Sequence, residues 1–492
     1  MNFLNAFEWK YVNAVRKTDN ENSGGTHFVS DFAKAPCDLL IIPKSSRIEY
    51  RVTYLNGDKS VMDTPFMRDE GYIVPHSSFY ALEVRYTDSN KAPTLEELKE
   101  IGFTVTPFEA SQNIDVFDAP LGSFSLAPYM SGLKMAKTIK ENMKAISPFG
   151  EYGHQSMTVF INGKGYTVYT ANNITMKEYD CNTFSRLAVY DIDEPEKARF
   201  FTVAKQGDNG GIKIDGVSSL VSIVYDGEKL ACNCYGFVNG IITEFYRAFD
   251  MEKEEFGELQ VCKIIKGDQV RDFTNRSIEE LFGAEYGLTK MKLEMGVGPY
   301  FKYEDEWYTW LYTGDKRFCG ILLKTRDFKN YEFVMVPEEP RGANCEIIPY
   351  FFKGYLYVAF RRDYGLQRLE VVKYDMKGLR PLESIVLKDT AMRPYFYEYN
   401  DELYLIHSPH LRHYTSIVKL STDRLFRMSK PVASIENMHI CTPCPIMYKG
   451  ELYLTFSSRQ GSYSQIFISH VSPKIPYTEE QVGDAFLKLI EG

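Results

Sequence analysis

This 492-residue sequence lacks long apolar runs and has no excess of basic residues. No window approaches the roughly 18 consecutive apolar residues of a transmembrane helix, so we expect no membrane insertion. The formal net charge is −9 at pH 7. Non-specific nucleic-acid binding needs a basic surface, so no nucleic-acid partner is predicted. The opening residues MNFLNAFEWKYVNAVRK lack the apolar core and cleavage site of a signal peptide.

Several motifs that mark enzyme classes are also missing. The sequence has no P-loop, no dinucleotide-binding fingerprint, no HExxH and no G-x-S-x-G. No cofactor is therefore predicted.

Cysteine is sparse and odd in number, with nine residues. Several sit alone inside apolar, strand-like runs, which indicates free buried thiols made in a reducing cytoplasm: Cys37, Cys262, Cys319 and Cys345. Two pairs are closer together, Cys232 with Cys234 and Cys441 with Cys444 behind His439. Neither neighbourhood supplies a fourth zinc ligand, so we predict that these pairs pack in the core and hold no metal.

Aromatic residues, by contrast, are abundant. The chain has 35 Tyr and 33 Phe but only 3 Trp, and hydrophobic residues make up 44% of it. This composition is typical of a globular protein rich in β-strands. Residues 25–110 alternate short apolar runs with turns, as in RIEYRVTYL and FYALEVRYT, and this pattern predicts a small β-sandwich. Within that region TLEELKEIG predicts a short helix, with Thr94 and Glu97 as a capping box. Helical periodicity over 126–147 predicts a connector helix.

A repeat begins at residue 151. Its unit is an apolar strand, a tight turn and an aromatic-rich strand, usually followed by a third strand. Anchor positions in the second strand align, and the last four recur at intervals of about 50 residues: Tyr166, Leu230, Tyr308, Tyr357, Tyr404 and Tyr453. Such amphipathic hairpins bury both faces when they pack as blades around an axis. We predict a mostly β chain with a six-bladed β-propeller, five blades plus an extra sheet being the alternative.

The predicted organisation has five parts. These are a linker-like segment, a β-sandwich module, a helical connector, the propeller and a closing helix, over residues 1–24, 25–110, 111–150, 151–475 and 476–492. The stretch FTNRSIEELFGAEYG predicts a helical insertion between two blades.

Residues 150–472 resemble the sialidase-like six-bladed propeller superfamily. The likeness lies in ANCEIIPYFFKGYLYVAFRRDYG, in MRPYFYEYNDELYLIHSPHLRHYTSIVKLS and in TPCPIMYKGELYLTFSSR. KTRDFKNYEF resembles a degenerate Asp-box turn, or the similar S-x-D-x-x-x-W turn of five-bladed glycosidases. The last blade has Cys-Thr-Pro where the family has a tyrosine, and no Phe-Arg-Ile-Pro segment opens the domain.

Residues 25–90 resemble a small β-module that recurs in phage tail proteins and other surface proteins of gut bacteria and their phages. The matching segments are IIPKSSRIEY and IVPHSSFYALEVRYT.

The sialidase resemblance implies three arginines that clamp a substrate carboxylate, because the planar guanidinium binds carboxylates bidentately. The candidates are Arg361 or Arg362, Arg393 and Arg412, with Arg459 as a spare. In the family a glutamate at the position of Glu346 is the base for a tyrosine nucleophile. The alternative for each arginine is a salt bridge at the surface or between blades, and for Glu346 it is an ion pair between blades.

Three further groups could act near the axis. His154 and Gln155 open the first blade, where His154 could transfer protons or be a satisfied core histidine. Asp208 lies in the loop QGDNGG and could be an acid catalyst that pairs with Glu346, or a turn residue. His407, beside a turn in IHSPHLRHY, is a less specific candidate for substrate binding.

Three functions fit these features. The first is a phage tail-associated host-recognition protein that binds, and could cleave, a cell-surface glycan. It would be made in the host cytoplasm, join other virion proteins through its N-terminal region and form a homo-oligomer. The second is a stand-alone glycoside hydrolase of sialidase type acting on terminal sugars. The third is a propeller that serves only as an interaction scaffold.

Overall fold

The computed structural model describes most of the chain. The described residues are 9–12, 27–30, 33–34, 39–55, 61–63, 72–74, 79–88, 92–101, 103–107, 116–117, 126–175, 182–286, 295–313, 320–336, 347–361, 369–387, 391–409, 414–422, 430–436, 440–460, 463–478, 480–482 and 484. The chain divides into two compact units, a smaller one drawn mainly from residues 1–112 and a larger one drawn from the rest. The finer domain boundaries given above remain predictions.

The smaller unit contains two sheets. One has the order β1-β2-β8-β5-β6 with β3 beside β8, and its strands are β1 (Trp9–Val12), β2 (His27–Ser30), β3 (Ala33–Lys34), β5 (Ile48–Leu55), β6 (Val61–Asp63) and β8 (Phe79–Tyr86). The other is β7-β4-β9, formed by β7 (Tyr72–Val74), β4 (Leu39–Pro43) and β9 (Phe103–Pro107). Tyr50 of the first sheet packs edge-on against Phe103 of the second, with ring centroids 5.4 Å apart.

Two features of this unit bear on the sequence predictions. Helix α1 (Leu95–Ile101) begins at the predicted capping box, where the Glu97 amide donates to the Thr94 hydroxyl at 3.3 Å and the Thr94 amide to the Glu97 carboxylate at 2.7 Å. Residues 1–24 were predicted to be a linker, but they include strand β1.

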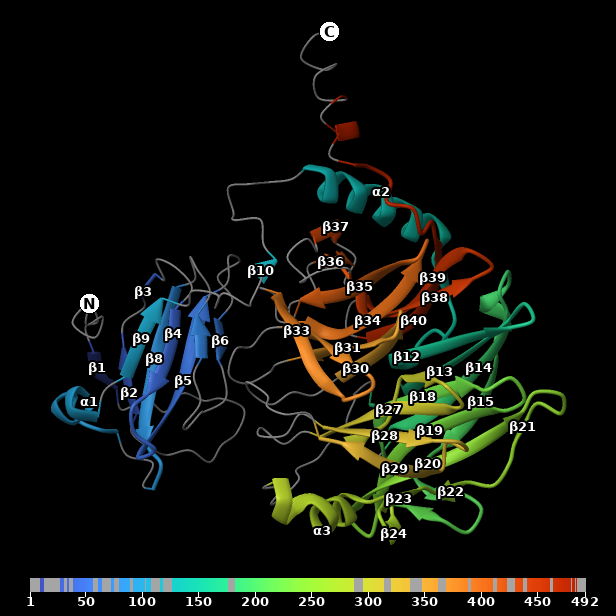
Figure 1. Ribbon diagram of the computed structural model, residues 1–492, viewed down its shortest axis with the longest axis horizontal. Helices are drawn as coiled ribbons and strands as arrows, with labels where there is room; N and C mark the ends of the chain where they lie inside the picture. The colour runs from blue at the N-terminus through green and yellow to red at the C-terminus, as the bar shows by residue number, and fades with distance from the viewer. Residues whose placement is uncertain are drawn as a thin grey trace. The chain divides into compact units, whose positions relative to one another are not determined.

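The larger unit is a ring of six sheets, the predicted six-bladed propeller (Figure 1). In chain order the blades are formed by β12 (Tyr152–Ile161), β13 (Lys164–Asn172), β14 (Phe184–Asp191) and β15 (Arg199–Ala204); β18 (Gly216–Tyr225), β19 (Leu230–Val238), β20 (Ile241–Asp250), β21 (Glu255–Phe256) and β22 (Gln260–Val261); β26 (Tyr300–Tyr303), β27 (Glu306–Thr313), β28 (Ile321–Thr325) and β29 (Asn330–Met335); β30 (Ile347–Phe352), β31 (Tyr355–Arg361), β32 (Leu369–Asp375) and β33 (Arg380–Leu387); β34 (Ala391–Tyr399), β35 (Glu402–Pro409), β36 (Tyr414–Leu420) and β37 (Lys430–Glu436); and β38 (Ile440–Tyr448), β39 (Glu451–Gln460) and β40 (Tyr463–Val471). All six repeat anchors lie in the second strand of their blade.

Shorter elements complete the sheets. The third blade also includes β23 (Lys263–Lys266), β24 (Gln269–Asp272) and β25 (Met295–Gly296), and β10 (Val116–Phe117) pairs with β33 of the fourth. Helix α3 (Asn275–Tyr286) forms in the predicted segment, but it lies between β24 and β25 of the third blade's sheet and not between two blades. A small hairpin, β16 (Gly207–Asp208) with β17 (Lys213–Ile214), connects the first two blades.

The ring is closed by residues that precede the first blade. Strand β11 (Lys144–Ala145) pairs antiparallel with β40 and supplies the fourth strand of the last blade. Next to it the Ile146 amide donates to the Ile466 carbonyl at 2.8 Å. The predicted helix over 126–147 is therefore shorter, α2 (Leu126–Asn142), because the residues after it extend to reach β40. The last blade is thus completed by residues that come before the first blade in the chain.

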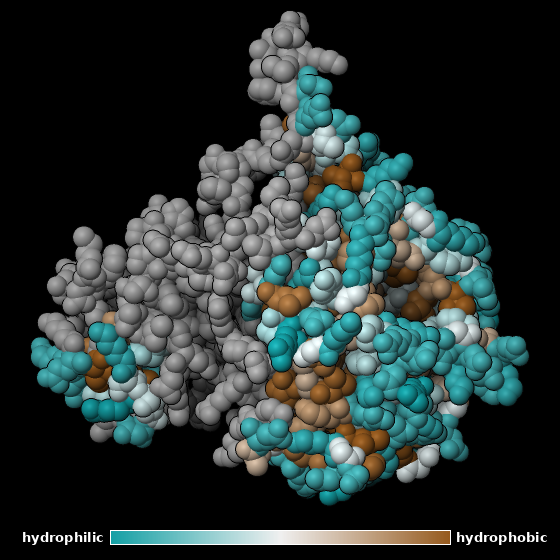
Figure 2. All heavy atoms as spheres, viewed as in Figure 1, coloured by the Kyte–Doolittle hydropathy of each residue, from teal (hydrophilic) through white to brown (hydrophobic). Residues whose placement is uncertain are grey.

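Hydrophobic clusters fill the spaces between blades. One joins the second, third and fourth blades, one joins the fourth, fifth and sixth with α2, and two smaller ones join the first blade to its neighbours. Hydrophilic residues dominate the described surface of this unit in Figure 2, with apolar patches among them. The described cysteines are free and buried, as predicted: Cys232, Cys234, Cys262, Cys441 and Cys444. The other predicted buried thiols, Cys37, Cys319 and Cys345, lie outside the described residues.

None of the helices in the described part of the chain is long and apolar enough to cross a membrane. Across the described ranges, no three His, Cys, Asp or Glu side chains gather as metal ligands would.

Candidate functional site

The inner strands are irregular at the end of the ring where they begin. The inner strand is the first long strand of each blade. In four blades its pairing with the second strand shifts register, at His154/Met157, Val217/Val221, Met392/Tyr395 and Cys441/Cys444. In the third blade, Gly298 and a cis Pro299 separate β25 from β26. Such bulges re-aim side chains and are frequent beside active sites. Two of them hold non-glycine residues at positive φ, Gln155 at 53° and Thr442 at 49°, a conformation that side chains rarely adopt.

Polar side chains are buried at this level of the ring. His154, Gln155 and Ser156 are at most 5% exposed, and Thr442 is fully buried. The Thr442 hydroxyl has no hydrogen-bond partner among the described residues. Buried polar groups without partners are costly, so their presence here needs a functional or structural reason.

His154 joins the first blade to the last. Its Nδ1 lies 3.2 Å from the Ser457 hydroxyl, and that hydroxyl also lies within hydrogen-bond distance of the Cys441 carbonyl, at 3.4 Å. The ring is 4% exposed. Of the two roles considered for His154, the geometry favours the satisfied core histidine.

An ionic cluster that sequence reasoning missed lies beside His154. Glu151, immediately before the first inner strand, is paired with Arg186 of β14 at 3.1 Å and accepts a hydrogen bond from Tyr169 of β13 at 2.8 Å. Burial raises the pKa of Glu151, and the Arg186 guanidinium and the Tyr169 phenol oppose the rise. The only sequence signal was the position of Glu151 within EYGHQS, because Arg186 and Tyr169 look like ordinary strand residues.

The predicted arginines have a mixed outcome. Arg361 ends β31, a second strand, and is half-buried at the same end of the ring. Arg393 lies in β34 between the positions where its register shifts, and Arg459 lies near the end of β39; their side chains fall outside the described residues. Glu346, Arg362 and Arg412 lie outside the described residues altogether. Their roles therefore remain predictions.

Two further candidates, Asp208 and His407, lie in described parts of the propeller. Asp208 is exposed in the β16–β17 hairpin, where its carboxylate accepts the Gly211 amide hydrogen at 2.8 Å. This is the turn role that was its alternative. His407 lies on β35 opposite Ser416 and is 2% exposed.

Comparison with known proteins gives structural matches only. No protein-family model and no curated protein sequence matches the chain. Sialidase from Trypanosoma rangeli in complex with sialic acid is 12% identical with a TM-score of 0.46, over 69% of this chain and 56% of that one. The Hadza microbial sialidase Hz136 is 10% identical with a TM-score of 0.46, over 91% and 96%. The intramolecular trans-sialidase from Ruminococcus gnavus, in complex with oseltamivir carboxylate, is 10% identical with a TM-score of 0.47, over 65% and 94%. The chain spans a little over half the length of the trypanosomal sialidases it matches.

Proposed function

We propose that this propeller binds a cell-surface glycan at the end of the ring where its inner strands begin. One observation carries the proposal. At this end of the ring the strand pairing is interrupted, and polar side chains, above all Gln155 and Thr442, are buried at the same positions. Backbone strain and buried polar groups at one level of a fold are features that binding sites retain and plain packing removes.

The biological setting we propose is host recognition by a phage tail. Two observations support it. The described cysteines are free thiols, as in proteins made in a reducing compartment. The two segments that resemble tail modules include parts of β5 and β8, which are hydrogen-bonded neighbours, and Arg85 of one segment forms an ion pair with Glu49 of the other.

Hydrolysis is the second activity to test at this end of the ring. The purified protein is screened against fluorogenic glycosides, sialosides included, beside two variants. Glu346→Gln removes the predicted base. Glu332→Gln removes a surface carboxylate of β29, half-exposed and remote from the inner strands, and serves as the control.

The outcomes separate the candidate functions. Turnover lost in Glu346→Gln and kept in Glu332→Gln would establish a glycosidase. Retention of the protein on a glycan array without any turnover would support a receptor-binding protein. Failure on both the substrates and the array would leave the propeller as an interaction scaffold and overturn the proposal.

A further inference from the structure

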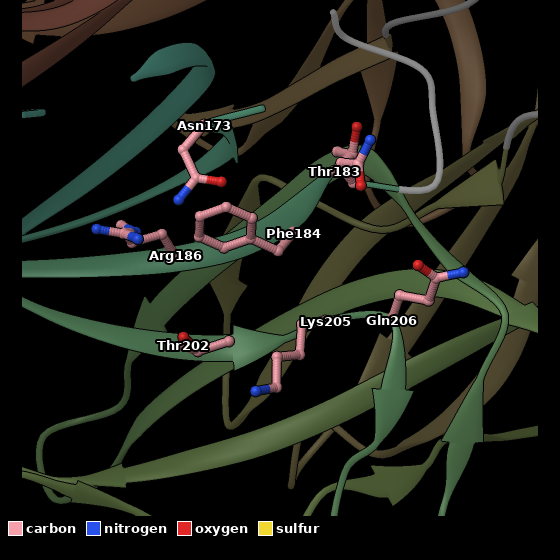
Figure 3. A pocket seen from close by; sticks show the side chains of 8 residues that line it. Asn173, Thr183, Phe184, Arg186, Thr202, Lys205 and Gln206 are labelled. Atoms are coloured by element: carbon pink, nitrogen blue, oxygen red, sulfur yellow. The ribbon is translucent and has the colours of Figure 1, made fainter. Parts of the chain in front are cut away.

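The first blade contains a pocket that is separate from the inner strands. It has a volume of about 290 Å³ and lies where β13 ends, β14 begins and β15 ends. Its lining comprises Asn173, Asn182, Thr183, Phe184, Arg186, Thr202, Lys205 and Gln206. Figure 3 shows the Phe184 ring at the centre of this group, with Arg186 on one side and Lys205 and Gln206 on the other. The volume is at the lower end of the range for small-molecule sites, which fits one sugar residue better than a longer ligand.

The polar lining is suited to hydroxyl groups. Three side-chain amides, from Asn173, Asn182 and Gln206, and two hydroxyls can both donate and accept hydrogen bonds. A sugar ring presents donors and acceptors of the same kind around its edge. A bare inorganic anion would use only the donors, so this lining favours a saccharide.

The pocket also presents an apolar surface on which a sugar ring could pack. The Phe184 ring lies in the lining, and the Arg186 guanidinium lies 4.8 Å from its centroid. A second aromatic ring, that of Phe200, lies 5.2 Å from the same guanidinium. Apolar faces next to convergent polar groups are the usual composition of a ligand site.

The charge of the lining is one-sided. Arg186 and Lys205 are cationic, and none of the eight lining residues is acidic. Glu151 offsets the charge of Arg186 from behind. Lys205 is exposed, and its ammonium has no carboxylate partner within the described part of the chain. The eight lining residues that the structure describes therefore carry a positive charge.

We propose that this pocket binds a single anionic sugar residue, with Lys205 contacting the acidic group and the amides contacting ring hydroxyls. The pocket goes beyond the proposed axial site, since none of its lining residues belongs to an inner strand. It would act as an accessory contact that holds an acidic glycan at the same end of the ring.

The test uses three probes that share one ring: methyl β-glucoside, methyl β-glucuronide and glucose 6-sulfate. They are titrated against the full-length protein by ligand-observed NMR at low ionic strength. The two anionic probes are expected to bind more tightly than the neutral one. Lys205→Gln is expected to weaken both anionic probes about 2- to 5-fold and to leave the glucoside unchanged, as for an exposed ion pair. The ratio of the two anionic affinities tells a carboxylate from a sulfate preference.

Lys213→Gln is the matched control, because Lys213 is an exposed lysine of the neighbouring hairpin outside the lining. Equal binding of all three probes, equal loss in the Lys205 and Lys213 variants, or no binding of any probe would overturn the proposal. Repeating the titration with Glu346→Gln keeps the result independent of the axial site. If the anionic probes still bind the Glu346→Gln variant, while the protein neither hydrolyses nor retains glycans at its axis, the pocket proposal is supported. Only the proposed axial function is then rejected.

Discussion

The Tyr169 phenol donates a 2.8 Å hydrogen bond to the Glu151 carboxylate. Glu151 immediately precedes β12, Tyr169 lies on the neighbouring strand β13, and the acceptor carboxylate is 5% exposed. A buried carboxylate needs its hydrogen bonds and its counter-ion, so this contact holds the start of the first inner strand in place.

Tyr169→Phe is expected to lower the free energy of unfolding by about 1.5–3 kcal/mol, because it removes a hydrogen bond to a charged, buried acceptor. The measurement is urea unfolding followed by fluorescence. Tyr225→Phe is the control, since its phenol donates to the Gly227 carbonyl at an exposed position. That variant is expected to change the free energy by less than about 0.5 kcal/mol. Equal losses of unfolding free energy in the two variants would show that the Tyr169 hydrogen bond stabilises the fold no more than an exposed one does.

Glu244 makes stability depend on pH. It is 1% exposed in β20, and its Oε2 has no hydrogen-bond partner among the described residues. Burial raises the pKa of Glu244 well above 4.5. Because the pKa of Glu244 is higher in the folded than in the unfolded protein, its contribution to the free energy of unfolding is fully present below pH 4.5. The contribution is lost as the pH rises through the folded pKa, by about 1.4 kcal/mol per pH unit between the unfolded and folded pKa values.

Glu244→Gln stays neutral at every pH and is expected to remove this loss. Unfolding midpoints of the wild type should fall from acidic to alkaline pH more steeply than those of the variant. The exposed Glu255→Gln serves as the control and should follow the wild type. Parallel curves for the wild type and Glu244→Gln would contradict a raised pKa.

Gly132→Ala tests how helix α2 packs. In an isolated helix this change stabilises by about 1 kcal/mol. Here the added Cβ would lie 1.6 Å from the Ser434 carbonyl oxygen of β37, so helix and strand must separate. We expect a net loss of about 1–3 kcal/mol in thermal or urea unfolding. Lys137→Ala, on the exposed side of the same helix, should change stability by less than about 0.5 kcal/mol. A gain in stability for Gly132→Ala would disprove the close approach.

Asp327 organises the turn that resembles a degenerate Asp-box. Its Oδ1 accepts the Lys329 and Asn330 amides at 3.1 and 2.8 Å. Phe328 of the same turn is 1% exposed and packs against Tyr300. Asp327→Ala is expected to lower stability by about 1–2 kcal/mol through the lost acceptor. Asp327→Asn keeps an oxygen there and should recover most of the loss in the same unfolding measurement. An equal loss in both variants would assign the effect to charge instead.

The blade hairpins could be predicted because their signals are local. Asn162–Gly163 and Lys449–Gly450 both have positive φ at their two central residues, the conformation of tight hairpin turns. The strands on either side are short and apolar, and the anchor, aromatic in five of the six blades, recurs at a fixed distance from each turn. Sequence therefore identified the repeat and, from it, the ring.

The closure of the ring could not be predicted in this way. Strand β11 has two residues, too few for any period, and its partner β40 is more than three hundred residues later in the chain. Only the closed ring brings the two together. The register shifts of the inner strands have the same origin, because each depends on how its blade meets the axis and not on local composition.

The sequence by itself determined the strand repeat, the turns, the buried free cysteines and the residue types available for chemistry. The tertiary structure decided what those residues do. It placed His154 against Ser457 of another blade, gave Asp208 a turn amide to bind, and brought Glu151 to Arg186. The reason is physical: burial, pairing and pKa depend on neighbours distant in the chain, whereas turn and strand preferences depend on neighbours within a few residues.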